Sequence, residues 1–323
     1  MTWIKRFIVP VTLGVAIVLT FSASLLPRFD LFLAGQLALL IIVTAALVLL
    51  MGGAGLLSLS SAAFLGVGAY GSIILVERLQ IPLLIALPAI AVVGGLVGWL
   101  LGLVSLRLSG FYLAIVTLGF IMILLIVMKQ GGELTGSGYG LIAPTITLPV
   151  LGDLNAQSFA LIAVFLSVLA VSGAATLMRS RFGRSWLALR DNEPAALMQG
   201  INVRGAKLRA FALSSAVISG AGGVFAFLLG SANPGSFTTG VSIFHIALVV
   251  VGGLTGGLVG AVVAPIVLFL LPEIFDFGEY RDLFYAGLLL AVLVFVPSGI
   301  SGAFTTVTKR LRLARRRSEG ADK

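Results

Sequence analysis

The sequence predicts an all-α membrane protein that crosses the bilayer about ten times. Hydrophobic residues occupy 59% of the 323 positions and charged residues only 10%, whereas soluble domains carry about 25% charged residues. The apolar residues form long continuous runs, and a helix needs about 20 of them to span a bilayer. A transmembrane barrel would instead show alternating segments of about ten residues. Because only helices and closed barrels can span lipid, the continuous runs favour helices.

Ten candidate spans follow one another along the chain. They are residues 7–26, 32–51, 56–76, 82–105, 111–128, 157–178, 210–230, 243–256, 257–272 and 283–298. We treat residues 1–308 as a single transmembrane domain, followed by a basic tail, 309–323, that is expected to lie on anionic lipid headgroups. The first span also has the basic start of a signal peptide, so both cleavage and retention stay open, and we expect retention.

The distribution of lysine and arginine predicts the orientation, because cytoplasmic loops are enriched in these residues. With a cytoplasmic N-terminus, all but four of the 21 lysines and arginines fall on the cytoplasmic side. The four exceptions are Arg28, Arg78, Lys129 and Arg281. This frame puts both termini and the segment 179–209 in the cytoplasm.

Residues 243–272 resemble one long span, but a single pass would put the basic tail outside. We therefore expect a broken or short helical hairpin that turns in the glycine-rich run 252–257, because glycine permits tight turns. Each arm is shorter than a full span, and such helices are tolerated only where protein buries them. The hairpin is thus expected inside the protein, either crossing twice or re-entrant.

The titratable residues argue against several mechanisms. No Asp, Glu, Lys or Arg falls well inside a predicted span, whereas proton- and ion-coupled carriers keep such groups at membrane depth. Coupling to sodium held by backbone carbonyls stays open. The lone histidine, His245, fits a structural role better than a proton relay. No lysine follows a glycine, so we expect no phosphate-binding loop. With one histidine, no cysteine and no paired acids inside the predicted spans, we also expect no metal site and no enzyme.

The segment 179–209 is the longest cytoplasmic connection and contains the signals of a short helix. Asp191 or Asn192 can cap the helix at its start, and Pro194 suits its first turn. Gly200 suits the left-handed position just beyond its end. The alternative is a solvated basic loop that only satisfies the charge rule.

Glu193, Ala195, Ala196 and Gly200 resemble the EAA loop of ABC-importer permeases. The block GRSWLALRDNEPAALMQGINVRGAKLRAF around them is similar to the branched-chain amino acid permease family, of the LivM type. Further similar blocks are GLLSLSSAAFLGVGAY, GFYLAIVTLGF, TGSGYGL, VVVGGLTGGLVGAVVAP and PSGISG. The resemblance covers about residues 35–302. The family usually has Gln and His where this chain has Leu57 and Ser61, which bears on the substrate.

The resemblance implies the permease subunit of an ABC importer for branched-chain amino acids, or for related small polar solutes such as urea or short amides. Its partners would be a related LivH-type permease, two cytoplasmic ATP-binding subunits and a periplasmic or lipid-anchored solute-binding protein. ATP would bind to the partner subunits, so this chain would hold no cofactor and would contact no nucleic acid. The location would be a bacterial inner membrane. A secondary transporter of small solutes is the alternative function.

The resemblance also implies roles for individual residues. Contact with the ATPase is expected to depend on Arg184, Arg190, Glu193, Ala195, Ala196 and Gly200. Ala196 is expected on the helix face that packs into the ATPase. Tyr112, Thr117 and Thr135 belong to the central blocks and are candidates for lining the translocation path. Thr117 has the alternative of bonding only to its own helix.

Two further patterns have two interpretations each. Glycines repeat every fourth residue at 94, 98 and 102 and at 252, 256 and 260, which favours close helix packing over a path lined by small side chains. The acidic residues Glu273, Asp276, Glu279 and Asp282 are expected on the outer side. They are either simply solvated, or they form a docking surface for the binding protein. In the second case their charge would speed the encounter of the two proteins.

Overall fold

The computed structural model describes residues 19–20, 27–106, 108, 110–148, 152–253, 258–275 and 287. Most of the predicted first span, all of the last span except Gly287, and the basic tail lie outside the described residues, as does most of the acidic cluster after Glu273.

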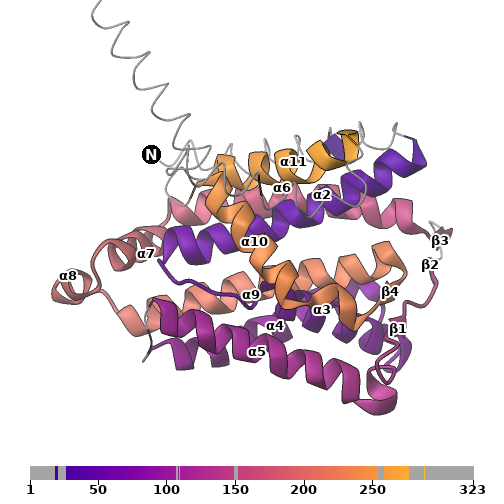
Figure 1. Ribbon diagram of the computed structural model, residues 1–323, viewed down its shortest axis with the longest axis horizontal. Coiled ribbons are helices and arrows are strands. Elements are labelled where there is room, and N and C mark those ends of the chain that lie inside the picture. Colours follow the sequence, from indigo (N-terminus) through magenta and orange to yellow (C-terminus); the bar gives the residue numbers. More distant parts are fainter. Residues whose placement is uncertain are drawn as a thin grey trace, which may run out of the picture.

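The described chain is mostly helical (Figure 1). The α-helices are α2 (Arg28–Leu47), α3 (Ser61–Glu77), α4 (Leu83–Ser105), α5 (Phe111–Gln130), α6 (Ala156–Met178), α7 (Arg181–Asp191), α8 (Glu193–Met198), α9 (Val203–Leu229), α10 (Thr239–Gly252) and α11 (Leu258–Phe275). A π-helical segment, Val48–Gly53, prolongs α2, and two short 3₁₀ turns cover Gly132–Leu134 and Pro234–Phe237.

Four short strands complete the described secondary structure. They are β1 (Leu141–Ile142), β2 (Ile146–Leu148), β3 (Gly152–Leu154) and β4 (Ser231–Ala232). β1 pairs antiparallel with β4, and β2 pairs antiparallel with β3. Because β1 follows α5 and β4 follows α9, the first pair ties together the ends of two long helices.

Five described helical stretches are long and apolar enough to cross a membrane: Arg28–Gly53, Leu83–Val104, Tyr112–Gln130, Ala156–Met178 and Val203–Leu229. Three shorter apolar helices accompany them: Ser61–Glu77, Thr239–Gly252 and Leu258–Leu270. Most of these agree with the predicted spans to within a few residues. The predicted span 56–76 is wrong in its first part, because α3 begins only at Ser61.

Helix α9 lies at the centre of the bundle and packs against α2, α3, α4 and α6. Glycine makes the closest of these approaches. A Cβ atom on Gly68 of α3 would lie 1.9 Å from the carbonyl oxygen of Ser219 in α9. On α4, a Cβ atom on Gly98 would lie 2.1 Å from Oγ of Ser215. The glycine repeat at 94, 98 and 102 therefore serves close helix packing, as its spacing predicts.

The predicted break in the 243–272 region is present. Helix α10 ends at Gly252, and Gly253 has a φ of +93°, which L side chains rarely adopt. A Cβ atom on Gly260 would lie 1.9 Å from the carbonyl oxygen of Gly252, so the two arms touch through their backbones. Helix α10 contacts α2, α3, α5 and α11. Helix α10 thus packs into the bundle on one side, but Ile243 is 54% exposed and Val259 is 59% exposed, so the described residues do not enclose the hairpin as predicted. Its arms also begin and end at residues other than those predicted.

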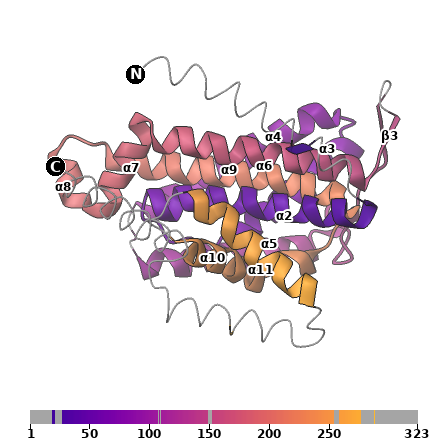
Figure 2. The same ribbon diagram turned by 90° about the horizontal axis from the view of Figure 1, so that it is seen from above.

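The two ends of the molecule differ in content. Helices α7 and α8 lie at one end, beyond the start of α9, and the strands lie at the opposite end (Figures 1 and 2). The basic residues of the segment 179–209 therefore gather at one end. Arg78 bonds to the backbone carbonyl of Glu133 at the other end. The two predicted sides of the membrane thus correspond to opposite ends of the bundle.

Candidate functional site

Helix α7 is fixed to the membrane helices by two long side chains. Trp186 is buried, and its Nε1–H donates to the carbonyl of Ala206 in α9 at 3.0 Å. Arg190 donates from Nη1 to the carbonyl of Gly52 at 2.7 Å, at the end of the π-helical segment. Arg190 also pairs with the neighbouring Asp191 at 3.0 Å. Helix α7 is therefore bound to both α2 and α9, so the segment 179–209 is not a loose loop.

Helix α8 is capped at both ends as the sequence predicts. Asn192, rather than Asp191, is the N-cap, and its Oδ1 accepts from the backbone N–H of Ala195 at 3.0 Å. Gly200 has a φ of +76°. The N–H of Gly200 donates to the carbonyl of Leu197, and the N–H of Ile201 donates to the carbonyl of Ala196. This pair of hydrogen bonds is the Schellman arrangement, in which carbonyls at the helix end are satisfied.

The exposed face of α8 is not the one expected. Ala196 is 1% exposed and packs inside the chain, so its predicted position on an outward, ATPase-facing side is wrong. Leu197 is 56% exposed and Met198 is 92% exposed. Ala195 and Arg184 are also exposed. Large apolar side chains on a capped surface helix are what a protein partner would contact, and the motif-based reasoning missed both.

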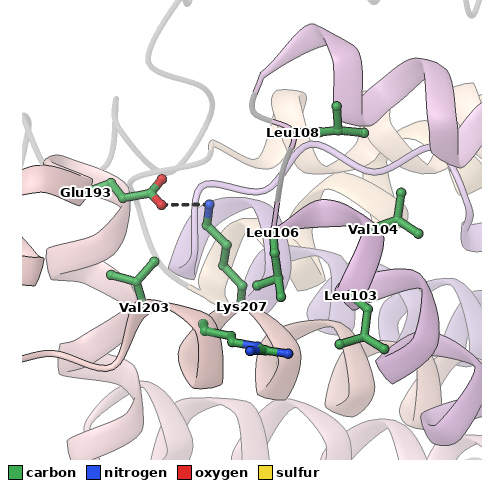
Figure 3. A pocket seen from close by; sticks show the side chains of 8 residues that line it. Leu103, Val104, Leu106, Leu108, Glu193, Val203 and Lys207 are labelled. Atoms are coloured by element: carbon green, nitrogen blue, oxygen red, sulfur yellow. Dashed lines mark ion pairs between the residues drawn. The ribbon is translucent and has the colours of Figure 1, made fainter.

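Glu193, the first residue of α8, forms an ion pair with Lys207 of α9 (Figure 3). Lys207 Nζ lies 2.8 Å from Glu193 Oε1, and the lysine side chain is only 5% exposed. Charged groups are rarely this buried unless they are paired. The ion pair links the short helix directly to the central helix of the bundle. Helix α9 begins at Val203, so the last residues of the predicted loop 179–209 are helical.

A second constellation surrounds the stretch between the π-helical segment and α3. Gly55 has a φ of +70°, and residues 55–60 form no helix. The N–H of Leu59 donates to Thr117 Oγ1 at 2.9 Å. Thr117 also donates to the carbonyl of Ala114 at 3.0 Å. Thr117 thus bonds back to its own helix, as one interpretation predicted, and in addition holds the non-helical segment.

Polar side chains from α10 meet the start of α3 next to this segment. Ser242 Oγ accepts from the backbone N–H of Ala62 at 3.0 Å. Ser61 Oγ lies 3.1 Å from Nδ1 of His245 and 3.3 Å from Ser242 Oγ. All of these side chains are buried. His245 is therefore a buried, hydrogen-bonded histidine, which is what the structural interpretation predicts.

The other two candidates for the translocation path lie elsewhere. Tyr112 is 69% exposed on the outside of α5. Thr135 follows the end of α5, roughly 20 Å along the helix from Thr117 at 1.5 Å per residue. Its buried Oγ1 has no hydrogen-bond partner among the described residues. The structure therefore does not bring Tyr112, Thr117 and Thr135 together, and Thr117 alone belongs to the buried polar cluster.

Comparison with known proteins places the chain in a family of transport proteins. The family model for the permease component of branched-chain amino acid transport systems matches residues 31–293. The chain belongs to this family. The match covers α2 to α11, so it includes helices α7 and α8, the non-helical segment and the α10–α11 hairpin.

Individual relatives support the same assignment. The chain is 33% identical over 287 residues to the high-affinity branched-chain amino acid transport system permease protein LivM of Escherichia coli K12, covering 80% of this chain and 67% of that protein. It is 26% identical over 263 residues to a probable LivH permease of Methanocaldococcus jannaschii, covering 76% and 82% of the two chains. It is 27% identical over 245 residues to LsrC, an autoinducer 2 import permease of Enterobacter sp. strain 638, covering 73% and 68%. No solved structure matches the chain.

Proposed function

We propose that this chain is a permease subunit of an ABC importer for branched-chain amino acids or related small polar solutes such as urea or short amides. It would reside in a bacterial inner membrane with both termini in the cytoplasm and about ten passes. The family membership and the two LivM relatives at 33% identity support this proposal. The similarity to a LivH permease supports pairing with a related permease subunit. The similarity to LsrC makes the solute the part of the proposal that most needs a test.

Helices α7 and α8 would receive the ATPase. The main support for this role comes from α8, which is only six residues long and is capped at both ends. Its Glu193 is paired with Lys207 of α9, and its Leu197 and Met198 are exposed. An isolated helix of this length would not be stable in water. Its tertiary anchors therefore make it rigid enough to transmit a displacement to α9 and, through Arg190, to the end of the π-helical segment.

The partly buried non-helical segment 55–60, between the π-helical segment and α3, would belong to the part that moves during translocation. Transporters commonly place their substrate sites at interrupted helices near the bilayer centre. Non-helical backbone at this depth is tolerated only where protein or a cavity surrounds it. Here the N–H groups of Leu59 and Ala62 are held by hydroxyls from α5 and α10. A displacement of Arg190 at one end could thus change the hydrogen bonds of the segment at the other.

The chain would have no catalytic activity and would bind neither ATP nor a metal or cofactor; ATP would bind to the two partner subunits, and a periplasmic or lipid-anchored binding protein would deliver the solute. The purified chain should not hydrolyse ATP. The assembled complex in proteoliposomes should hydrolyse ATP faster when leucine, isoleucine or valine is supplied with the binding protein. If urea stimulates ATP hydrolysis and the three amino acids do not, the proposed solute would be urea instead of a branched-chain amino acid. Uptake that persists without the ATPase subunits would favour the secondary transporter instead.

The contact surface has a matched test on one helix. The double variant Leu197→Ser, Met198→Ser should lower solute-stimulated ATP hydrolysis and the amount of ATPase that copurifies. Gln199→Ala changes an exposed residue at the end of the same helix without removing a large apolar side chain, and it should leave both quantities near wild type. Equal copurification of the ATPase with wild type and the double variant would refute the role of this surface.

A further inference from the structure

A pocket of about 800 Å³ opens beside the Glu193–Lys207 ion pair. It lies between the end of α4 and the start of α9 (Figure 3). Its apolar wall includes Leu103, Val104 and Leu106, and its polar wall consists of Glu193, Arg204 and Lys207. Two cations and one carboxylate leave one positive charge in excess. The pocket is therefore suited to an anion that also carries apolar groups.

An exposed apolar stripe leads away from this pocket along α4. Val92, Leu96, Leu100 and Val104 are spaced by four residues, so they lie on one face of the helix. Each of them is between 45% and 63% exposed. At 1.5 Å per residue the stripe is roughly 18 Å long. One leaflet of the hydrocarbon core is about 15 Å thick, half of the whole. The stripe thus matches the length of a lipid acyl chain that starts at the pocket.

We propose that this pocket binds an anionic phospholipid of the cytoplasmic leaflet, with its phosphate at Arg204 and Lys207 and an acyl chain along the exposed face of α4. The leaflet follows from the proposed orientation, since the pocket lies at the same end as α7 and α8. The phosphate and the Glu193 carboxylate are both anions, and both would bind Lys207. Because Glu193 begins α8, the occupant would affect the ion pair that joins α8 to α9.

Retention of lipid by the purified, delipidated transporter complex tests the site without requiring transport. Native mass spectrometry would compare phosphatidylglycerol with phosphatidylcholine, which has the same chains but no net charge. We expect preferential retention of phosphatidylglycerol. Arg204→Gln should weaken it about fivefold, the contribution of one basic residue near an anionic surface. Glu193→Gln removes the competing carboxylate and should strengthen it. Arg181→Gln, an exposed position of α7 outside the pocket, should have no effect.

Several results would overturn the lipid site. One is equal retention of the two lipids, and another is retention that Arg204→Gln leaves unchanged. Loss of the retained phosphatidylglycerol on addition of millimolar inorganic phosphate would identify a free anion as the ligand. If the chain purified alone retains the lipid but the complex with the partner permease does not, the partner permease is the occupant of the stripe. Because retention is read without ATP, a failure of the proposed transport function would leave this measurement unaffected.

A second measurement addresses regulation and rests on the proposed function. In proteoliposomes, adding phosphatidylglycerol to phosphatidylcholine should change solute-stimulated ATP hydrolysis of the wild-type complex more than that of the Arg204→Gln complex. An identical lipid response of the two complexes would refute the link between the pocket and α8.

Discussion

Substitutions at Gly200 should disturb the end of α8 in proportion to how poorly each residue adopts a left-handed conformation. Gly200 has a φ of +76°, and an added Cβ atom would meet nothing within 4 Å. Steric collision with neighbours therefore contributes nothing, and the cost is conformational only. For an L residue with a Cβ atom the left-handed conformation costs roughly 1–2 kcal/mol, and asparagine is an exception that visits it readily. A β-branched residue should be at the upper end of this range or beyond it.

This cost acts on a helix with little stability of its own. Relieving the strain at position 200 would break the two hydrogen bonds that end the helix, from Gly200 to Leu197 and from Ile201 to Ala196. A change of 1–2 kcal/mol shifts an equilibrium by a factor of about 5–30. We therefore expect Gly200→Val to reduce the fraction of intact helix end by that factor, Gly200→Ala by less, and Gly200→Asn to remain near wild type.

The assay compares solute-stimulated ATP hydrolysis and uptake in proteoliposomes at equal membrane abundance. Activity should fall in the order glycine, asparagine, alanine, valine, while the amount of inserted protein stays constant because the residue is exposed. An order that follows side-chain volume, with asparagine more harmful than alanine, would refute the conformational argument. Full activity of Gly200→Val would refute the role of this helix end in coupling.

Three further predictions concern other parts of the chain. The chain has no native cysteine, so a cysteine at Arg184 should be labelled only from the cytoplasm and one at Tyr139 only from outside; the reverse pattern would contradict the orientation. Thr117→Val removes the acceptor for the partly buried N–H of Leu59, which should cost about 1 kcal/mol and lower both thermal stability and uptake, whereas Thr117→Ser should retain both; equal melting temperatures would count against the bond. Gly68→Ala places a Cβ atom 1.9 Å from a carbonyl of α9 and should reduce folded yield, overpacking costing about 1–3 kcal/mol or more, whereas Gly119→Ala, with nothing within 4 Å, should express normally.

Features that depend on residues close together in the chain were predictable from the sequence. The long apolar runs became helices because a helix satisfies its backbone hydrogen bonds within one continuous segment, as lipid requires. The ends of α8 were predictable because Asn192 and Gly200 act through hydrogen bonds to residues within five positions. The hairpin break was predictable because consecutive glycines weaken a helix wherever they occur. Family membership was also predictable, from ordered blocks that resemble the family whose model matches residues 31–293.

Features that depend on distant partners were decided by the tertiary structure. Residues 56–60 belong to an apolar run that fits a helix by composition, so the sequence predicted one. The structure instead leaves this stretch non-helical, and Thr117, 58 positions away, accepts from the N–H of Leu59 in place of a carbonyl of the same helix. Arg190 lies close to the neighbouring Gly55, since a Cβ atom added to Gly55 would be 2.8 Å from Cγ of Arg190. Neither contact leaves a periodic signal in the sequence.

The exposed side of α8 was decided in the same way. Ala196, Leu197 and Met198 are all apolar, and a helix of six residues is too short for a clear periodicity. Helix α8 packs against α7 and α9, and Ala196 is buried in the chain. The ion pair between Glu193 and Lys207 holds the start of α8 to α9. Leu197 and Met198 consequently point outward. The sequence by itself therefore determined the elements and their caps through local hydrogen bonding, whereas burial against other helices decided which side chains are available to a partner.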